Sequence, residues 1–299
     1  METQGAFKSG YVSIIGEPNV GKSTLLNAMM GEQLAIVTPK PQTTRNQITG
    51  IVSTAAYQIV FLDTPGVLTP KYKLHDYMVQ AAYRAIQDSD IALYVIDAVS
   101  PAPTHEPQVL NALQKAGVVV FLVLNKIDLL PSKPALLPLI EAYGDKFAFA
   151  EIVPVSAMNG DGIAVLRERI VGYLPAGPAY FSNEQISDLP ERFFVAEAVR
   201  EQIFHQTQQE IPYASTVVVD EFKERPNGKT YISAVVYVEK PSQKGVLIGK
   251  AGRTIKAIGE SARRSIEAFL GARVYLELRV TVRENWRNDN RKLKTLGYS

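Results

Sequence analysis

The chain has 299 residues, of which 46% are apolar and 21% are charged, with 32 basic and 30 acidic side chains. This balance is typical of a globular protein of about two domains and excludes disordered and fibrous chains. The absence of cysteine excludes disulfides, thiolate nucleophiles and thiolate-bound metals, and the three histidines are too far apart in sequence to indicate a zinc site.

The first 170 residues alternate short apolar runs with amphipathic stretches. The runs at 11–16, 59–63, 91–97, 118–125 and 150–156 are expected to be strands, and the stretches at 74–87 and 162–171 are expected to be helices. Strands that alternate with helices predict an α/β domain with a mainly parallel sheet and helices on both faces. We assign this domain to residues 8–172.

A second domain is expected after residues 173–190, where periodicity is lost and glycine and proline gather as in a linker. A helix is predicted at 191–208, followed by strands at 215–222 and 230–238 around a tight turn at Pro226-Asn227-Gly228. Two helical segments follow, divided near 249–252 and again near Gly259, and a last strand spans 273–282. This order predicts an α+β domain over 191–299.

Charge divides the chain in the same way. Residues 241–299 hold 13 basic and 5 acidic side chains, a net charge of +8, whereas residues 1–240 carry a net charge of −6. A basic C-terminal segment behind an acidic N-terminal one indicates that the second domain binds a polyanion.

A phosphate-binding loop is predicted directly after the first strand. The sequence GEPNVGKS at 16–23 fits the pattern GxxxxGKS, and TLLNAMM then opens a helix. The glycines let backbone N–H groups surround a phosphate, Lys22 can reach the β- and γ-phosphates, and Ser23 can bind magnesium. The strand-loop-helix context favours this interpretation over an ordinary glycine-rich turn.

Three further motifs follow at the ends of successive predicted strands: DTPG at 63–66, NKID at 125–128 and VSA at 155–157. Asp63 lies where a magnesium ion on the phosphates would sit. The carboxylate of Asp128 can accept the ring N–H and the exocyclic amine of guanine, a pairing that adenine cannot make. The order of the four motifs predicts a guanine nucleotide site.

These motifs, together with QTTR at 42–45, resemble the Era, Der and MnmE group of the translation-factor-related GTPases. The resemblance implies GTP and GDP as ligands, catalytic roles for Lys22, Thr44 and Gly66, and a Mg²⁺ site formed by Ser23, Thr44 and Asp63, with Thr43 as the alternative to Thr44. The implied nucleotide-binding residues are Gly16, Glu17, Pro18, Asn19, Val20, Gly21, Lys22, Ser23, Thr24, Asp63, Thr64, Pro65, Gly66, Val67, Asn125, Lys126, Ile127, Asp128, Ser156 and Ala157.

Two positions bear on the rate of hydrolysis. Asn19 matches an asparagine that helps hold K⁺ in several relatives, the alternative being a hydrogen bond within the loop. Val67 stands where Ras-type enzymes carry a glutamine that orients the attacking water. Valine cannot do so, and we therefore expect slow intrinsic turnover unless K⁺, the backbone of Thr44 or a partner positions the water.

The segment Gly249-Lys250-Ala251-Gly252 resembles the GXXG loop of a KH domain, and the order helix, strand, strand, helix, helix, strand matches the type II arrangement. The residues expected to contact RNA are Ile248, Gly249, Lys250, Ala251, Gly252, Arg253, Lys256 and Arg279. Alternatively, Arg263, Arg264, Arg279 and Arg283 only cover solvated faces. Trp286 could stack on a base, but a packing anchor for the C-terminal segment is favoured.

One GTPase domain followed by a KH domain resembles the Era branch of the group over essentially the whole chain. The resemblance implies a monomer that binds near the 3′ end of small-subunit ribosomal RNA, acts on the small ribosomal subunit during its maturation and associates weakly with the membrane surface. The alternatives are a membrane-surface signalling GTPase and the GTPase part of an RNA-modifying system.

Two features of the sequence bear on localisation. The longest apolar run, at 116–124, is far shorter than the roughly 18 residues that a spanning helix needs. The first ten residues, METQGAFKSG, do not fit a secretion signal. We therefore expect a cytoplasmic protein.

Overall fold

The computed structural model describes residues 6–225 and 228–298, and its backbone separates into two compact units. The first unit comprises residues 6–35, 44–70 and 78–188. The second comprises 36–43, 71–77 and 189–298, so that two short segments from within the first half of the sequence belong to it.

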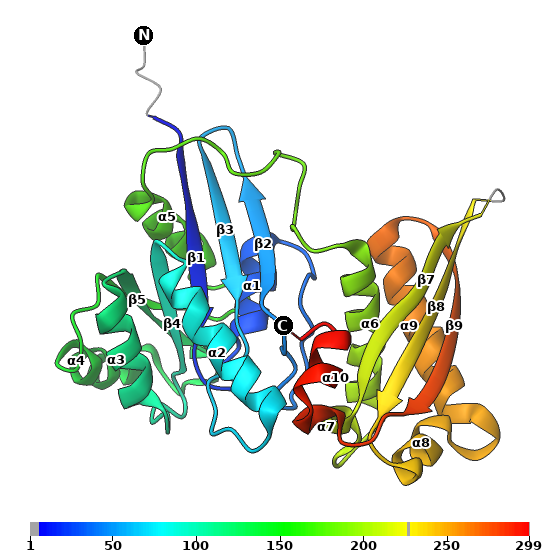
Figure 1. Ribbon diagram of the computed structural model, residues 1–299. Coiled ribbons are helices and arrows are strands. Elements are labelled where there is room, and N and C mark those ends of the chain that lie inside the picture. Colours follow the sequence, from blue (N-terminus) through cyan, green and yellow to red (C-terminus); the bar gives the residue numbers. More distant parts are fainter. Residues whose placement is uncertain (1–5, 226–227, 299) are drawn as a thin grey trace. The chain divides into compact units, whose positions relative to one another are not determined.

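The first unit is built on a six-stranded sheet in the order β2-β3-β1-β4-β5-β6 (Figure 1). All neighbours pair in parallel except β2, which is antiparallel to β3. The central strands read as continuous apolar runs because helices cover both of their faces. The strands are β1 (Lys8–Ile15), β2 (Ile48–Ser53), β3 (Tyr57–Asp63), β4 (Ile91–Asp97), β5 (Val119–Asn125) and β6 (Glu151–Pro154).

Helices lie on both faces of this sheet, as the sequence predicted. Side chains of α2, α3 and α4 pack with Tyr94 and Leu122 in one cluster, and α1 and α5 contact each other behind the sheet in Figure 1. In α2 the buried residues recur at helical spacing, from Leu74 and Met78 to Ile86. The helices are α1 (Lys22–Met30), α2 (Lys73–Gln87), α3 (Glu106–Ala116), α4 (Leu137–Gly144) and α5 (Ile163–Tyr173), with short 3₁₀ turns at Ile127–Leu129 and Lys133–Leu136.

The irregular segment after α5 is hydrogen-bonded to the strands of the first unit. The amide of Gln58, a fully buried residue, donates to the carbonyl of Phe181 at 2.9 Å and accepts from the backbone of Tyr180 and Phe181. The backbone N–H of Ile51 donates to the carbonyl of Ile186 at 2.8 Å. The loss of periodicity therefore marks an extended chain fixed to β2 and β3.

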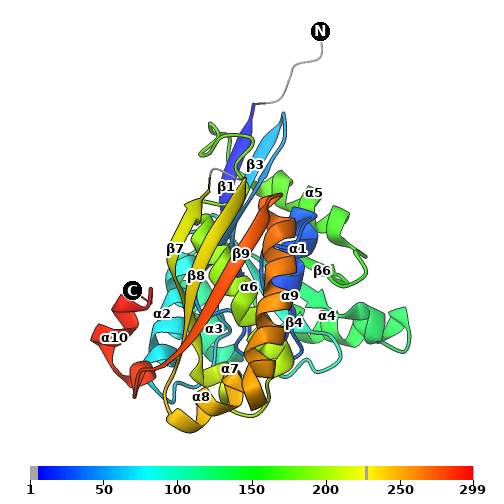
Figure 2. The ribbon, with the colours of Figure 1, turned by 90° about the vertical axis from the view of Figure 1, so that its right-hand side faces the viewer.

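The second unit carries a three-stranded sheet in the order β7-β8-β9, with β7 antiparallel and β9 parallel to β8. Helices α6 and α9 pack on one face around Val199, Ile258 and Ile232, and Figure 2 shows the strands with α6 behind them and α9 beside β9. The elements are α6 (Glu191–Gln206), α7 (Ile211–Ala214), β7 (Thr216–Glu224), β8 (Lys229–Val238), α8 (Pro241–Ile248), α9 (Arg253–Leu270), β9 (Arg273–Val282) and α10 (Asn290–Thr295), with 3₁₀ turns at Lys250–Gly252 and Trp286–Asn288.

Two details of the predicted elements differ from the structure. The break expected at Gly259 is wrong, because α9 continues through this residue; one glycine costs a helix only about 1 kcal/mol, and the apolar stripe of α9 outweighs it. The antiparallel strand β2 was not predicted. Of the turn expected at Pro226-Asn227-Gly228, the first two residues lie outside the described part of the chain.

Candidate functional site

The phosphate-binding loop lies between β1 and α1, and its glycines are required by close approaches. At Gly21 the backbone is left-handed, with φ 94°, and a Cβ atom would lie 2.2 Å from Nδ2 of Asn125. No other residue fits there. Helix α1 begins at Lys22, so that the N-terminus of the helix, with its unpaired N–H groups, faces the loop.

Three of the predicted metal-binding side chains meet beside this loop. The hydroxyl of Ser23 lies 2.7 Å from Oδ2 of Asp63 and 2.8 Å from the hydroxyl of Thr44. The second carboxylate oxygen of Asp63, Oδ1, is buried and has no hydrogen-bond partner among the described residues. Hydroxyl and carboxylate oxygens are ligands that Mg²⁺ prefers, and the unsatisfied oxygen fits a cation at this position.

Burial shifts the ionisation of both charged groups in the loop. It lowers the pKa of Lys22 to about 8 and raises the pKa of Asp63 to about 6, and the attraction between the two opposes each shift in part. The ammonium group of Lys22 donates to the carbonyl of Glu17 at 2.8 Å. The phosphates of a nucleotide would stabilise the ammonium form of Lys22, and a divalent cation would stabilise the carboxylate form of Asp63.

The DTPG motif is held against the phosphate-binding loop. The hydroxyl of Thr64 donates to the carbonyl of Ile14 at 2.7 Å, and the backbone N–H of Val67 donates to the carbonyl of Gly16 at 3.1 Å. A Cβ atom on Gly66 would lie 2.7 Å from the backbone nitrogen of Pro18. The side chain of Val67 is 2% exposed and packs into the apolar core, so it cannot face an attacking water.

The NKID motif contains a buried amide, Asn125, that links two loops, and an exposed carboxylate, Asp128. The amide of Asn125 donates to the carbonyl of Val20 at 2.8 Å and accepts from the N–H of Ala157 at 3.0 Å, joining the phosphate-binding loop to the loop after β6. Lys126 forms a 2.6 Å ion pair with Asp97 at the end of β4, a residue that the sequence analysis missed. The carboxylate of Asp128 is exposed and accessible to a base. Thr24 lies in the first turn of α1, and the other predicted nucleotide residues lie on these same loops.

In the second unit, the predicted GXXG loop joins α8 to α9 in a left-handed conformation. Gly249 has φ 70° and Gly252 has φ 76°, and a Cβ atom on Gly249 would lie 2.2 Å from the hydroxyl of Thr254. Lys250 within the loop and Arg253 directly after it are exposed. The loop presents a bare backbone next to two basic side chains, which suits the approach of a phosphodiester chain.

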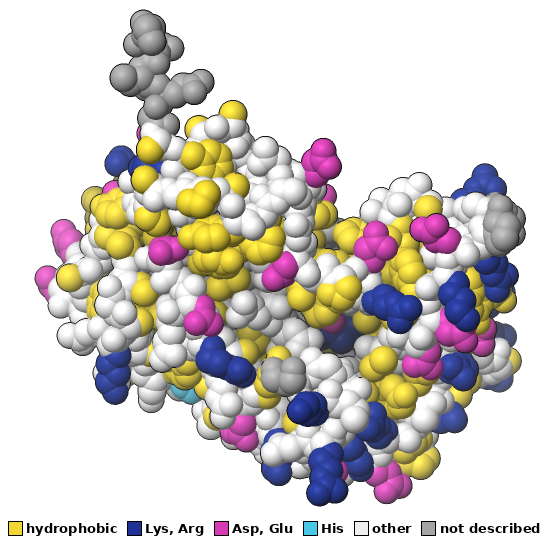
Figure 3. Space-filling view, turned by 45° about the horizontal axis from the view of Figure 1, so that its top comes forward, with side chains coloured by type: hydrophobic (Ala, Val, Ile, Leu, Met, Phe, Trp, Pro, Cys, Tyr) yellow, Lys and Arg dark blue, Asp and Glu magenta, His cyan; other side chains and the backbone are white. Residues whose placement is uncertain are grey.

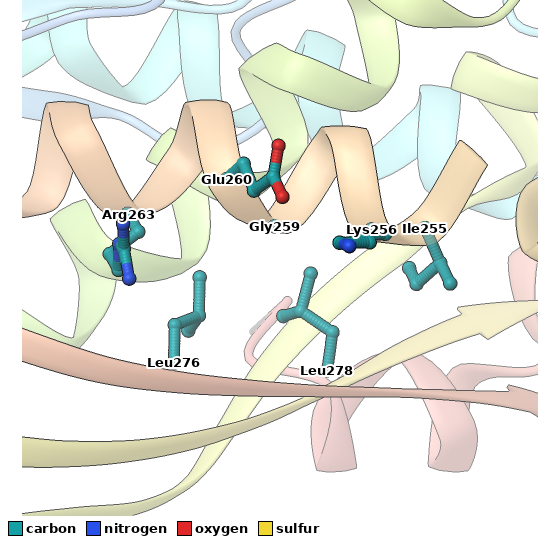
Figure 4. Close-up of a pocket in the computed structure, with 7 residues that line it drawn as sticks. All are labelled: Ile255, Lys256, Gly259, Glu260, Arg263, Leu276 and Leu278. Carbon is teal, nitrogen blue, oxygen red and sulfur yellow. The ribbon is translucent and has the colours of Figure 1, made fainter. Parts of the chain in front are cut away.

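A groove of about 310 Å³ lies between α9 and β9, and its first lining residue in α9, Ile255, comes three positions after the loop. Figure 4 shows Leu276 and Leu278 pointing from β9 toward the α9 side chains. Lys256, a predicted RNA contact, lines this groove. Arg263 also lines it, although the sequence analysis did not include Arg263 among the RNA contacts. The sequence spacing of 256, 259, 260 and 263 could have indicated one helix face. The lining residues are Ile255, Lys256, Gly259, Glu260, Arg263, Leu276 and Leu278.

Arg279, a predicted RNA contact, and Trp286, for which a packing anchor was favoured over base stacking, do not line this groove. Arg279 projects from the opposite face of β9 and forms a 2.9 Å ion pair with Asp220. Trp286 is fully buried, and its indole N–H donates to the carbonyl of Ala214 at 3.0 Å, which confirms the packing anchor. Basic side chains gather over the second unit in Figure 3, interspersed with acidic ones.

The second unit also holds the segment that precedes Thr44. The buried guanidinium of Arg200 in α6 donates to the carbonyl of Thr43 and pairs with Glu197 at 2.5 Å. Lys40 donates to the carbonyls of Phe204 and Thr207 at the end of α6. A cation at this position is favourable because the last carbonyls of a helix are unpaired. The chain from 40 to 43 is thus fixed to α6.

No helix in the described ranges has both the length and the apolar character needed to cross a membrane.

Comparison with known proteins agrees with this architecture. Residues 11–126 match the family described as 50S ribosome-binding GTPase, and residues 210–287 match the KH domain family. The chain is 49% identical to GTPase Era of Geotalea uraniireducens, over 99% of each chain, and 49% identical to GTPase Era of Geobacter metallireducens, over 98% of each.

Two solved structures share the whole fold at 38% identity and a TM-score of 0.95, and each match covers 98% of this chain. One is a tyrosine-to-alanine variant of Aquifex aeolicus Era bound to GDP·AlF4⁻, matched over its full length, and the other is Era in complex with MgGDPNP and nucleotides 1506–1542 of 16S ribosomal RNA, matched over 99%. The shared fold, the two family matches and the identity over nearly the whole length show that the chain is a GTPase with a KH domain and belongs to the GTPase Era family.

Proposed function

We propose that the protein is a GTP-controlled RNA-binding factor that acts on the 3′ end of small-subunit ribosomal RNA during maturation of the small subunit. A solved relative holds MgGDPNP and a segment of 16S ribosomal RNA, and 98% of this chain matches that structure. The motifs for a nucleotide and for RNA lie on separate units. The proposal therefore needs a connection between the two.

The nucleotide is held, in this proposal, by the four loops of the first unit. Ser23, Thr44 and Asp63 bind Mg²⁺, Lys22 binds the phosphates, and Asp128 pairs with guanine. Mg²⁺ would neutralise phosphate charge during transfer to water. The convergence of the two hydroxyls on Asp63, and the unsatisfied Oδ1 of that residue, support Thr44 over Thr43 as the metal-binding threonine.

The observation that carries the connection is the junction between Thr43 and Thr44. The carbonyl of Thr43 accepts from Arg200 in the second unit, while the next residue contacts Ser23 in the first. One peptide bond therefore separates a metal-binding hydroxyl from a contact with α6. Because α6 packs against α9, which carries the RNA groove, loss of the γ-phosphate and release of Thr44 would alter the support of the groove.

The test measures RNA affinity in the two nucleotide states by fluorescence anisotropy. The probe is labelled RNA of the 1506–1542 segment, at one salt concentration, with a non-hydrolysable GTP analogue or with GDP. We expect at least about 5-fold tighter binding with the GTP analogue, the lower end of ordinary coupling between sites. Equal affinities in both states would contradict the connection, and binding only to unrelated RNA would contradict the ribosomal target.

A matched pair of variants locates the connection. Lys40→Met removes both hydrogen bonds to the end of α6 and should bring the two affinities closer together. Lys115→Met removes the same charge from an exposed site on α3 and should leave their ratio unchanged. A Lys40→Met variant with an intact ratio would show that the segment 36–43 does not carry the coupling.

The role of K⁺ is a separate part of the proposal. Asn19 lies in the phosphate-binding loop with a left-handed backbone, φ 67°, and we propose that it helps hold K⁺ beside the phosphates. Turnover measured in K⁺ and in Na⁺ at equal ionic strength should then be faster in K⁺, and Asn19→Ala should remove the difference. Equal rates in both salts would contradict this role.

We further propose a cytoplasmic monomer with GTPase, linker and KH boundaries at 8–172, 173–190 and 191–299. Its contact with membranes is expected to be weak and salt-sensitive, because it would rest on exposed basic side chains. Flotation with anionic vesicles at low and physiological salt tests this contact. Strong binding that persists at high salt would favour a membrane-surface signalling GTPase instead.

A further inference from the structure

The outer face of the sheet β7-β8-β9, turned away from α6 and α9, carries an aromatic and basic cluster that the RNA groove does not include. Alternate residues of β8 and β9 project from this face, and the parallel register sets Tyr231 directly beside Tyr275. The next residue along each strand, Ile232 in β8 and Leu276 in β9, points to the other face and packs in the core with the helices. The strands can be followed in Figure 2.

The two tyrosine rings and one guanidinium form a compact stack. The ring centroids of Tyr231 and Tyr275 lie 5.9 Å apart with an angle of 17° between the planes. The guanidinium of Arg225 lies 4.5 Å from the centroid of Tyr231 and 5.9 Å from that of Tyr275. Planar aromatic and guanidinium groups at such distances attract each other and offer flat surfaces to a third planar group.

The tyrosines are held in position, yet they are not part of the core. The hydroxyl of Tyr231 donates to the carboxylate of Glu277 at 2.8 Å, and Tyr275 is 58% exposed. Trp286, by comparison, is fully buried although arginines surround it in sequence. A ring that leaves more than half its surface in water contributes little to folding, so stability does not account for an oriented pair at this position.

Charge around the pair is suited to a nucleic acid. Lys229 and Arg273 project next to the tyrosines, two register pairs away and therefore on the same face, and both are exposed, as is Arg225. Two acidic side chains are neighbours: Glu277, which accepts the hydrogen bond of Tyr231, and Glu221 on β7. Lys223, the register partner of Tyr231, pairs with Glu221 at 2.8 Å, and Arg279 pairs with Asp220 at 2.9 Å. Four basic side chains therefore stand against two acidic ones around the tyrosines: Lys223, Arg225, Lys229 and Arg273 against Glu221 and Glu277.

We propose that Tyr231, Tyr275 and Arg225 form a second RNA contact, at which an unpaired base stacks on the exposed tyrosine while the neighbouring cations bind the backbone. This inference rests on the proposed RNA binding of the groove. Strand β9 is an edge of the sheet, and Leu276 and Leu278 line the groove on one side while Tyr275 projects on the other. A strand that leaves the groove across β9 therefore reaches the tyrosine pair.

Aromatic side chains on adjacent strands of an open sheet are the usual platform for single-stranded RNA, since every base has a face that can stack. A peptide that added to the open edge of β9 would use the backbone of that strand and would not need these side chains, and a peptide helix would need an apolar groove. On this face the long side chains are charged or aromatic, which favours RNA.

The experiment compares two RNA lengths on the full-length protein. A short probe of about four nucleotides fills the groove alone, and a long probe extends it by about six unpaired nucleotides at each end. Tyr275→Ala should weaken the long probe by about 5- to 100-fold, the range for loss of one stacked base, and leave the short probe unchanged. Tyr275→Phe, which keeps the ring, should bind both probes as the unaltered protein does.

A matched control is Tyr180→Ala, which removes a tyrosine that is 49% exposed in the first unit and should affect neither probe. Nucleotide affinity and melting temperature verify that each variant is folded. If the unaltered protein binds neither probe, the proposed RNA function and this inference both fail. If it binds both, and Tyr275→Ala binds the long probe with full affinity or weakens both probes equally, only the second contact is overturned.

Discussion

Lys22 and Asp63 are buried in the nucleotide site, and burial drives the pKa of each toward its uncharged form. The basic side chains at the GXXG loop, such as Lys250 and Arg253, are exposed. A buried charge interacts strongly with its ligand because little water screens it, whereas each exposed charge contributes little and depends on salt. Single substitutions should therefore act strongly in the first unit, and backbone shape should matter more in the second.

The largest effect in the first unit is expected from Asp128→Asn, because the bound base would cover this exposed carboxylate. The carboxylate of Asp128 can accept two N–H groups of guanine, and an amide would turn a donor toward one of them. We expect discrimination between GTP and ATP to fall by about 10³- to 10⁴-fold, as when a polar group of a base is left unpaired. Affinities of fluorescent analogues of both nucleotides measure it. Asp145→Asn removes the same charge from an exposed site and should leave the ratio unchanged; an unchanged ratio in Asp128→Asn would contradict the base contact.

In the second unit, shape is tested by Gly249→Ala. The added methyl group would lie 2.2 Å from the hydroxyl of Thr254 in a left-handed backbone, so the loop must deform. We expect RNA affinity to fall by about 10- to 100-fold, corresponding to strain of a few kcal/mol, with GTP turnover unaffected. Gly271→Ala has a similar φ of 62° and open space around the added atom. Its RNA affinity should be normal, and equal losses in both variants would show that the GXXG loop has no special role.

The sequence predicted local features of both units better than contacts between distant segments. Short motifs at strand ends were enough to predict that the loops after β1, β3 and β5 lie together, because the carboxyl ends of parallel strands meet at one edge of the sheet. The fold class of both units followed from periodicity. Strand β2 was missed because its six residues, ITGIVS, form a short edge strand with a glycine in the middle, and that pattern is weak.

Contacts between distant segments were not predictable. The Asp97–Lys126 pair, the Arg200 contact with Thr43 and the position of Arg279 depend on which strands and helices become neighbours. In particular, Arg279 and Leu278 are adjacent in sequence but project from opposite faces of β9. A basic residue count cannot distinguish these faces, whereas the pleat of the strand does.

The cost of the buried charges themselves is measurable without ligand. The pKa of Asp63 is about 6 in the folded protein against an ordinary 3.8, so the folded state binds the proton more tightly and the free energy of unfolding falls as pH rises from about 4 to 6. Asp63→Asn should remove this dependence and stabilise the nucleotide-free protein at pH 7 by about 1–3 kcal/mol. Urea unfolding at pH 4.5 and 7 measures both effects.

Lys22 has the opposite dependence. Its pKa is about 8 in the folded protein against an ordinary 10.5, so the unfolded state binds the proton more tightly and the free energy of unfolding should rise as pH increases from 8 to 10.5. This rise should persist in Asp63→Asn and disappear in Lys22→Met. If Asp63→Asn were instead less stable than the unaltered protein at pH 7, burial of the Asp63 carboxylate would not lower the stability of the folded state. The difference drawn between buried charges in the first unit and exposed charges in the second would then lose its energetic basis.

The smallest effect on activity is expected at Val67, which sits within a nucleotide motif but has its side chain in the core. Because Val67 bonds to the phosphate-binding loop through its backbone N–H, which alanine keeps, Val67→Ala should leave intrinsic GTP turnover within a few-fold. The cavity in the core should lower the free energy of unfolding by about 1–3 kcal/mol. Single-turnover hydrolysis at saturating GTP and urea unfolding separate the two effects. Val123→Ala, in the middle of β5, is the matched control for a core cavity. If Val67→Ala lost as much turnover as Lys22→Ala while Val123→Ala lost none, the side chain would be acting on the reaction, and slow hydrolysis could not be attributed to the missing glutamine.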